Sequence, residues 1–183
     1  MTKILILLLT LLIILAKIIK NIVVRGSLMK TTKADVIQTA ADIADKNGLN
    51  NVSLKVVAES LNIRTPSLYN HIDSLESLLR EIAHNGMKTM NERMMQAAIG
   101  KIGDDAVKSI GITYLDYMIE HPGIYETIQW ATWHGTEETG KIFDNYLSLL
   151  KTLALSCNFN PVNLDEILNL LTGVLHGYTT LQL

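Results

Sequence analysis

The sequence predicts an all-α protein with two helical parts. Apolar residues recur about every 3.6 positions along most of the 183-residue chain. Residues that favour the start or the end of a helix separate these stripes at short intervals. After Met29 we find no alternation of apolar and polar residues of the kind that indicates a strand. We therefore expect an N-terminal domain of short helices, joined by a long helix to a C-terminal helical bundle.

The N-terminal part contains the signals for short helices in quick succession. Gly48 is expected to end the first helix, and Ser53 to cap the second. Asn62 suits the left-handed conformation of a sharp stop, and Thr65 is expected to cap a third helix with Pro66 at its first position. The first helix carries an apolar stripe of Val36, Ile37, Ala40, Ala41, Ile43 and Ala44.

A long helix is expected to follow a cap at Asp73 or Ser74. The next helix runs from about Asp104 to Glu120, and a short one ends near Trp130. A polar link is expected between Gly135 and Gly140. The remaining helices are expected over 142–156, with Phe143 and Leu147 among the inward-facing residues, and over 164–180.

Composition and charge narrow the functional classes. The chain has 16 Lys and Arg against 18 Asp and Glu, but residues 1–28 contain four of the basic residues and no acidic one. Residues 29–75 contain five basic and five acidic side chains. A single cysteine, Cys157, excludes an intrachain disulfide. We find no phosphate loop, no paired nucleophile and base, and no metal-binding spacing, so the sequence does not favour an enzyme or a cofactor.

Three short helices, the last two joined at "SLNIRT", form the layout of a helix-turn-helix, whose third helix enters the DNA major groove. Polar side chains on its outer face suit base contacts, while the preceding turns and Lys33 in the N-terminal arm suit phosphates. The expected DNA-contacting residues are Lys33, Ser53, Lys55, Arg64, Thr65, Pro66, Ser67, Tyr69, Asn70 and His71.

Simpler interpretations exist for several of these residues. Tyr69 suits a packed aromatic as well as a DNA contact, and His71 and Lys55 suit plain solvated side chains. Ser53 is useful as a helix cap whether or not it also meets a phosphate. Because residues 29–75 carry no net charge, we expect few phosphate contacts and a shallow dependence of binding on salt.

The segment "AADIADKNGLNNVSLKVVAESLNIRTPSLYNHIDSLESLL" resembles the DNA-binding domain of TetR-family transcriptional regulators. The resemblance runs from Ala40-Ala41 to Leu78-Leu79. The sequence departs from the family pattern at Asn62, usually Gly, at Arg64, often Ser, and at Ile72, usually aromatic. The resemblance implies a DNA-binding regulator, a repressor released by a small molecule, that acts as a homodimer on a palindromic double-stranded operator in the cytoplasm.

The C-terminal part resembles the regulatory domain type marked by Trp133-His134-Gly135, with His176-Gly177 on a later helix. In the family this part dimerises and holds a small-molecule pocket. Met and aromatic side chains suit such a pocket, although each also suits plain core, and each His suits a structural role. The candidate pocket residues are Met90, Met94, Tyr114, Tyr117, Met118, Tyr125, Trp130, Trp133, His134 and His176.

The resemblance gives three expected segments: an extension over 1–28, a DNA-binding domain over 29–75 and a regulatory domain over 76–183. Family members continue with one more long helix after the His-Gly helix, so we interpret the regulatory domain as truncated at Leu183 and the homodimer as dependent on a complete C-terminus. The apolar run Ile4–Ala16 is shorter than a membrane span, and we favour an upstream reading-frame extension before Met29. The alternative is a membrane-tethered sensor anchored by residues 1–24.

Overall fold

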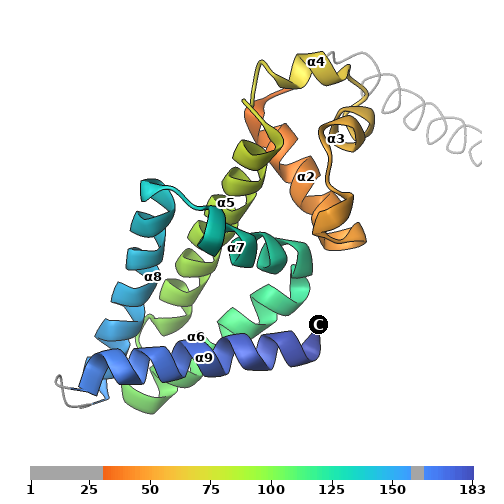
Figure 1. Cartoon of the computed structure of the whole chain (residues 1–183). Coiled ribbons are helices and arrows are strands. Elements are labelled where there is room, and N and C mark those ends of the chain that lie inside the picture. Colours follow the sequence, from red (N-terminus) through yellow and green to blue (C-terminus); the bar gives the residue numbers. More distant parts are fainter. Residues whose placement is uncertain (1–30, 158–162) are drawn as a thin grey trace, which may run out of the picture. The chain divides into compact units, whose positions relative to one another are not determined.

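The computed structural model describes residues 31–157 and 163–183, and these residues contain helices and no strand. The predicted all-α fold is therefore confirmed. Figure 1 shows the helices in order. Their bounds are α2 Lys33–Asn47, the 3-10 helix η1 Leu49–Asn51, α3 Leu54–Ser60, α4 Thr65–Leu68, α5 Leu75–Ala98, α6 Gly103–Glu120, α7 Pro122–His134, α8 Glu137–Ser156 and α9 Leu164–Gln182.

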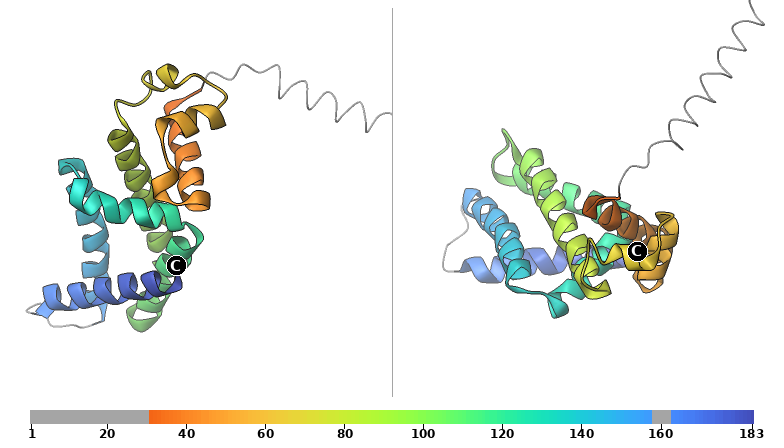
Figure 2. Two further views of the ribbon diagram at one scale, coloured as in Figure 1. Left: turned by 45° about the vertical axis from the view of Figure 1, so that its right-hand side comes forward. Right: turned by 90° about the horizontal axis from the view of Figure 1, so that it is seen from above.

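The three helices α2, α3 and α4 lie together at one end of α5 (Figures 1 and 2). The Thr32 side chain caps α2 by accepting from the Asp35 amide, and Ser53 caps α3 by accepting from the Val56 amide. Gly48 has a φ of 83° and Asn62 a φ of 53°, so both turns use the left-handed region. The predicted stops at these two residues are confirmed.

Helix α5 is the element on which the rest of the described chain is assembled. It packs against α6, α7 and α8, and also against α2. Ser74 is its N-cap, which settles the choice between Asp73 and Ser74. The residues of α5 that point into the core are Leu78, Leu79, Ile82, Ala83, His84, Gly86, Met87, Met90 and Met94.

Four predicted details are wrong. The sequence predicts that Thr65 caps α4, but Arg64 is the N-cap and Thr65 is the first residue of the helix. No side chain caps the start of α4. Helix α7 continues to His134, and α8 begins at Glu137, so Gly140 lies inside a helix. Helix α8 turns Leu147 outward, where it is 38% exposed, whereas Phe143 is partly buried and packs against the core as predicted. Periodicity alone did not show which side of α8 faces the other helices.

The N-terminal extension lies outside the described residues. Predictions for residues 1–28, including the membrane anchor, are therefore not addressed by the structure. Among residues 31–157 and 163–183, no helix is both long enough and apolar enough to cross a bilayer.

Candidate DNA-binding surface

The end of α4 presents polar side chains outward from a buried anchor. Leu68 is fully buried and Ile72 is 4% exposed, whereas Tyr69 is 57% exposed and Asn70 is exposed. Helix α4 is short, and Tyr69 and Asn70 follow it in a turn whose amides donate to Pro66 and Ser67 carbonyls at 3.3 Å. Because the two apolar residues fix this turn, the polar side chains between them project from a rigid base.

The other expected contact residues surround this turn. Arg64 and Pro66 are exposed, and Ser67, Thr65 and His71 are half-buried. Ser53 is half-buried and accepts the Val56 amide at 3.3 Å, which confirms its role as a cap.

Two of the expected basic contacts already have carboxylate partners. The Lys33 ammonium pairs with Glu81 of α5, so it ties α2 to the long helix. Lys55 has an 80% exposed side chain and lies 4.0 Å from Glu59, a solvent-exposed pair that holds it weakly. Lys55 therefore stays available for a phosphate, whereas Lys33 would first have to leave Glu81.

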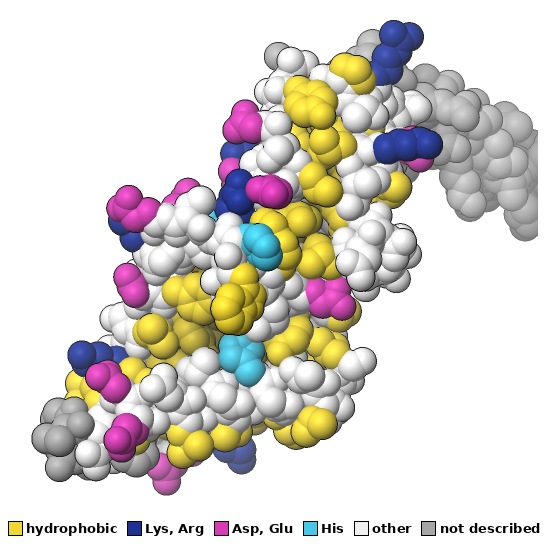
Figure 3. All heavy atoms as spheres, viewed as in Figure 1, with side chains coloured by type: hydrophobic (Ala, Val, Ile, Leu, Met, Phe, Trp, Pro, Cys, Tyr) yellow, Lys and Arg dark blue, Asp and Glu magenta, His cyan; other side chains and the backbone are white. Residues whose placement is uncertain are grey.

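Figure 3 shows Lys and Arg side chains beside α3 and α4, with acidic side chains further along the same face. On the face that Figure 3 shows, the basic groups of the described residues lie apart from one another and do not form a broad positive surface. This distribution agrees with the equal numbers of basic and acidic residues in 29–75.

Comparison with known proteins decides the family. The chain is 31% identical over 151 residues to "Uncharacterized HTH-type transcriptional regulator YobS" of Bacillus subtilis, an alignment that covers 82% of this chain and 78% of that protein. A bacterial regulatory protein of the TetR family from Rhodococcus RHA1 has the same fold, with a TM-score of 0.68, 16% identity and coverage of 81% and 83%. The chain belongs to the HTH-type transcriptional regulators, and its fold is that of the solved TetR-family regulator.

Two further comparisons concern a solved structure with DNA and the known protein-family models. The structure of BioQ with its natural double-stranded DNA operator matches this chain with a TM-score of 0.62 and 17% identity, and covers 82% of this chain and 86% of that one. No protein-family model matches the chain.

The Trp-His-Gly triplet lies at the end of α7. The ring of His134 stacks on Trp130 at 4.5 Å, and the His134 carbonyl accepts from Arg80 of α5 at 3.3 Å. Trp133 is 87% exposed. A Cβ on Gly135 would lie 2.7 Å from the Ala131 carbonyl oxygen, so this position needs glycine where the chain turns into α8. The triplet has a structural reason here, and its link to a domain type stays a prediction.

The structure brings some of the expected pocket residues together. His176 of α9 lies between Tyr114 and Tyr125, with ring centroids at 6.1 and 5.9 Å, and its Nδ1 is 3.1 Å from the Gln129 amide nitrogen. Burial lowers the pKa of His176, which favours the neutral ring. We call Tyr114, Tyr125, Gln129 and His176 the His176 cluster.

The remaining pocket candidates are placed apart from this cluster or beside it in the core. Met90, Met94 and Met118 are buried, while Trp133 and His134 are exposed on α7. Near the His176 cluster, the hydroxyl of Tyr146 is buried and has no hydrogen-bond partner among the described residues. The described residues contain no group of three or more His, Cys, Asp or Glu side chains placed to hold a metal ion.

Sequence reasoning missed the contacts that join α2 to α7. The Asp45 carboxylate accepts the Ile124 amide at 3.0 Å, and its other oxygen lies 2.8 Å from His121 Nδ1. Glu126 of α7 accepts the Leu49 amide at 2.9 Å. We call this set the α2–α7 junction. His121-Pro122-Gly123 signalled only a break in the sequence, and nothing in the chain pattern pointed to a partner some 79 residues earlier.

Proposed function

We propose that this chain is a sequence-specific repressor that reads DNA through the turn at the end of α4 and is released by a small molecule. The observation that carries the proposal is the exposure pattern at the end of α4 and in the turn after it, where Tyr69 and Asn70 are exposed between the buried Leu68 and Ile72. Tyr, Asn and Ser side chains offer hydroxyl and amide groups to base edges and phosphates. The BioQ structure with its operator supports double-stranded DNA as the partner.

The proposed contacts divide by chemistry. Ser67, Tyr69, Asn70 and His71 lie on the exposed side of α4 and the turn after it, where base edges come within reach. Arg64 and Lys55 are exposed at the neighbouring helix starts and suit phosphates. We keep the division into a DNA-binding part over 29–75 and a regulatory part over 76–183, since the Ser74 cap begins the long connecting helix.

A homodimer is the proposed form that binds a palindromic operator. Helix α9 supports it with an exposed apolar stripe, in which Leu170 is 67%, Val174 59%, Tyr178 49% and Leu181 83% exposed. These residues recur every three or four positions, so they share one side of the helix. A second copy would remove this stripe from water, which is the dominant favourable term in association.

The test of DNA binding is a fluorescence-anisotropy titration of the chain against DNA flanking its own coding sequence. Tyr69→Ala is expected to weaken specific binding at least about tenfold, a change of about 1.4 kcal/mol. Met95→Ala is the matched control, because Met95 is 59% exposed on α5, away from the proposed surface. Equal loss in both variants, or no loss in Tyr69→Ala, contradicts the proposed reading surface.

Sedimentation of the chain and of Val174→Asp tests the homodimer. The carboxylate would be buried without a partner in the proposed interface, so the variant is expected to sediment as a monomer where the original chain is a dimer. Met95→Asp is the control, since Val174 and Met95 are equally exposed at 59%. A dimer that survives Val174→Asp contradicts the α9 interface.

A further inference from the structure

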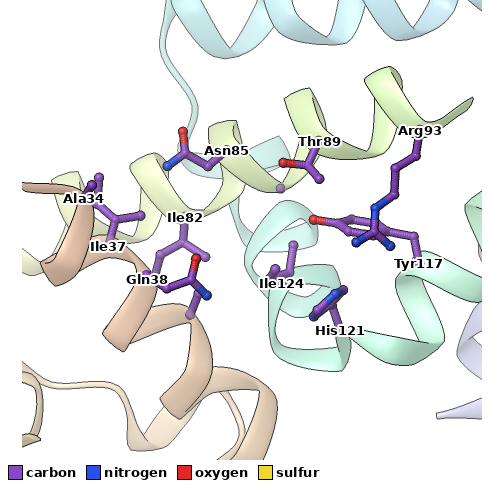
Figure 4. A pocket seen from close by; sticks show the side chains of 12 residues that line it. Ala34, Ile37, Gln38, Ile82, Asn85, Thr89, Arg93, Tyr117, His121 and Ile124 are labelled. Carbon is purple, nitrogen blue, oxygen red and sulfur yellow. The ribbon is translucent and has the colours of Figure 1, made fainter. Parts of the chain in front are cut away.

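A cavity of about 320 Å³ lies where α2 meets α5, α6 and α7 (Figure 4). Its volume falls at the lower end of the range for small-molecule sites. Of the residues expected to form a ligand pocket, Tyr117 alone lines this cavity, and no member of the His176 cluster does. The lining residues are Ala34, Ile37, Gln38, Ala41, Ile82, Asn85, Gly86, Thr89, Arg93, Tyr117, His121 and Ile124.

The walls of the cavity come from both functional parts of the chain. Ala34, Ile37 and Gln38 belong to α2, while Thr89, Tyr117 and other lining residues belong to the helices of the regulatory part. Figure 4 shows these side chains around a common space, with α2 on one side and α5 and α6 across from it. A molecule bound here would touch the helix that supports the DNA-reading turn.

The close approach of α5 and α7 at one wall requires glycine. A Cβ on Gly86 would lie 2.3 Å from Cγ2 of Ile124, closer than packed atoms come. Gly86 therefore lets Ile124 sit directly on α5, and the wall formed by these two residues is tightly packed.

The polar groups at the cavity include hydrogen-bonding groups without charge. Gln38 and Asn85 carry amides, and Thr89 and Tyr117 carry hydroxyls. Burial raises the pKa of Tyr117 to about 12, so its hydroxyl stays protonated and can donate at neutral pH. These groups suit a ligand with an amide, hydroxyl or carbonyl.

The two basic side chains that line the cavity already have acidic partners. Arg93 lies 3.3 Å from a carboxylate oxygen of Glu120 and stacks 4.8 Å above the ring of Tyr117. His121 pairs with Asp45 at 2.8 Å. Arg93 and Glu120 form a solvent-exposed pair, with side chains 47% and 63% exposed, and such a pair is weak. A charged ligand would still have to displace a partner from Arg93 or His121, whereas a neutral ligand displaces none.

We propose that this junction cavity is a second effector site, for a small neutral molecule with an apolar body and a hydrogen-bonding head, separate from the His176 cluster. Occupancy acts on the α2–α7 junction, because His121 both lines the cavity and holds Asp45 at the end of α2. The expected effect of the bound ligand on DNA affinity rests on the proposed function, whereas the binding of the ligand itself does not. The coupling is a difference in ligand affinity between the free and DNA-bound states.

The test uses three probes that share one apolar ring and differ in charge: benzamide, benzoate and benzylamine. Binding to the full chain is measured by ligand-observed NMR titration without DNA. We expect benzamide to bind, and the two charged probes to bind at least about tenfold more weakly. Equal binding of all three, or no binding of benzamide, would overturn the proposal.

Variants locate the binding. Thr89→Leu fills the cavity and is expected to weaken benzamide binding at least about tenfold, whereas Thr113→Leu, the same change at a half-buried position on α6 outside the cavity, leaves it unchanged. Gln38→Leu is a second variant, on an exposed residue whose side-chain amide donates to Asp42 of the same helix at 2.9 Å, and it removes a head-group partner. Unchanged binding in Thr89→Leu, or in a folded Gln38→Leu if Thr89→Leu fails to fold, overturns the site.

Measuring DNA binding with and without benzamide distinguishes a failure of this proposal from a failure of the proposed function. Benzamide is expected to change the affinity of the original chain for DNA and to leave that of Thr89→Leu unchanged. Benzamide binding with no DNA binding contradicts the proposed function alone. DNA binding with no benzamide binding contradicts the junction site alone, and DNA binding that ignores bound benzamide overturns its role as an effector site.

Discussion

The helix-turn-helix part and the regulatory part differ in where their helix starts find partners. Helices α2 and α3 are capped by Thr32 and Ser53, each three residues from the amide that it accepts. Helices α6 and α9 have no side-chain cap, and α7 receives its cap from Asp45 of α2. Helix α4 has no side-chain cap and Ser74 caps α5 locally, so the contrast concerns single helix starts: those of α2 and α3 are encoded locally, whereas that of α7 depends on a distant segment.

The two parts also differ in the polarity of the side chains that they expose. The exposed groups at the end of α4 are mostly polar and stand on the buried Leu68 and Ile72. Helix α9 instead exposes the apolar side chains of Leu170, Val174 and Leu181. We assign the polar surface at the end of α4 to DNA binding. We assign the exposed apolar surface of α9 to contact with a second copy of the chain.

The α2–α7 junction is where the two parts depend on each other most strongly, and Gly123→Ala tests it with the largest expected effect. The added Cβ would lie 2.1 Å from the Ala44 carbonyl carbon and 2.3 Å from the Asp45 amide nitrogen. Backbone atoms cannot swing aside, so we expect the free energy of unfolding to fall by about 3 kcal/mol. Thermal unfolding should show a Tm lower by roughly 6–12 °C.

Gly140→Ala is the matched control for that prediction. Gly140 lies inside α8 with no atom within 4 Å of an added Cβ. Alanine is the better helix former, so this variant is expected to gain about 0.5–1 kcal/mol. Similar behaviour of the two glycine variants would contradict the close approach of α7 to α2.

Asp45→Ala removes the side chain that caps α7 from α2. It leaves the Ile124 amide without its acceptor and His121 without its carboxylate. We expect the free energy of unfolding in urea to fall by about 1–2 kcal/mol. Asp42→Ala, which removes an exposed carboxylate on the same helix, should stay within about 0.5 kcal/mol of the original chain. An equal loss in both would mean that the junction adds nothing beyond α2 itself.

The smallest expected effect is a change in how stability depends on pH. Burial lowers the pKa of His84, which lies 2.8 Å from the Thr139 hydroxyl, and the Glu138 carboxylate opposes this only partly. The unfolded chain then binds the proton more readily, so the stability is full above pH about 6.5 and falls as the pH drops below it.

His84→Gln is therefore expected to lose stability less steeply than the original chain below pH about 6.5. Urea unfolding at a series of pH values measures the slope. The burial of His176 keeps part of the slope in both proteins. If the free energy of unfolding depends on pH equally steeply in His84→Gln and in the original chain, His84 has the same pKa in the folded and the unfolded state, which contradicts this prediction.

What the sequence could predict follows from this contrast. Gly48, Ser53 and Asn62 act within a few residues of themselves, so their roles were readable, and the anchors Leu68 and Ile72 follow the same short pattern. The cap of α7 by Asp45 and the facing of Leu147 are set by how distant helices meet. The junction cavity was missed for that reason, since its walls come from four helices.

The most direct test of the central claim is hydrogen exchange of the full chain with and without its DNA. The account predicts that DNA slows the exchange of amides over residues 53–72, where α3, α4 and the turn after it lie, and leaves α8 unaffected. Slower exchange confined to α8 or α9, with no change over 53–72 in the bound state, would contradict the assignment of this turn as the DNA-reading surface.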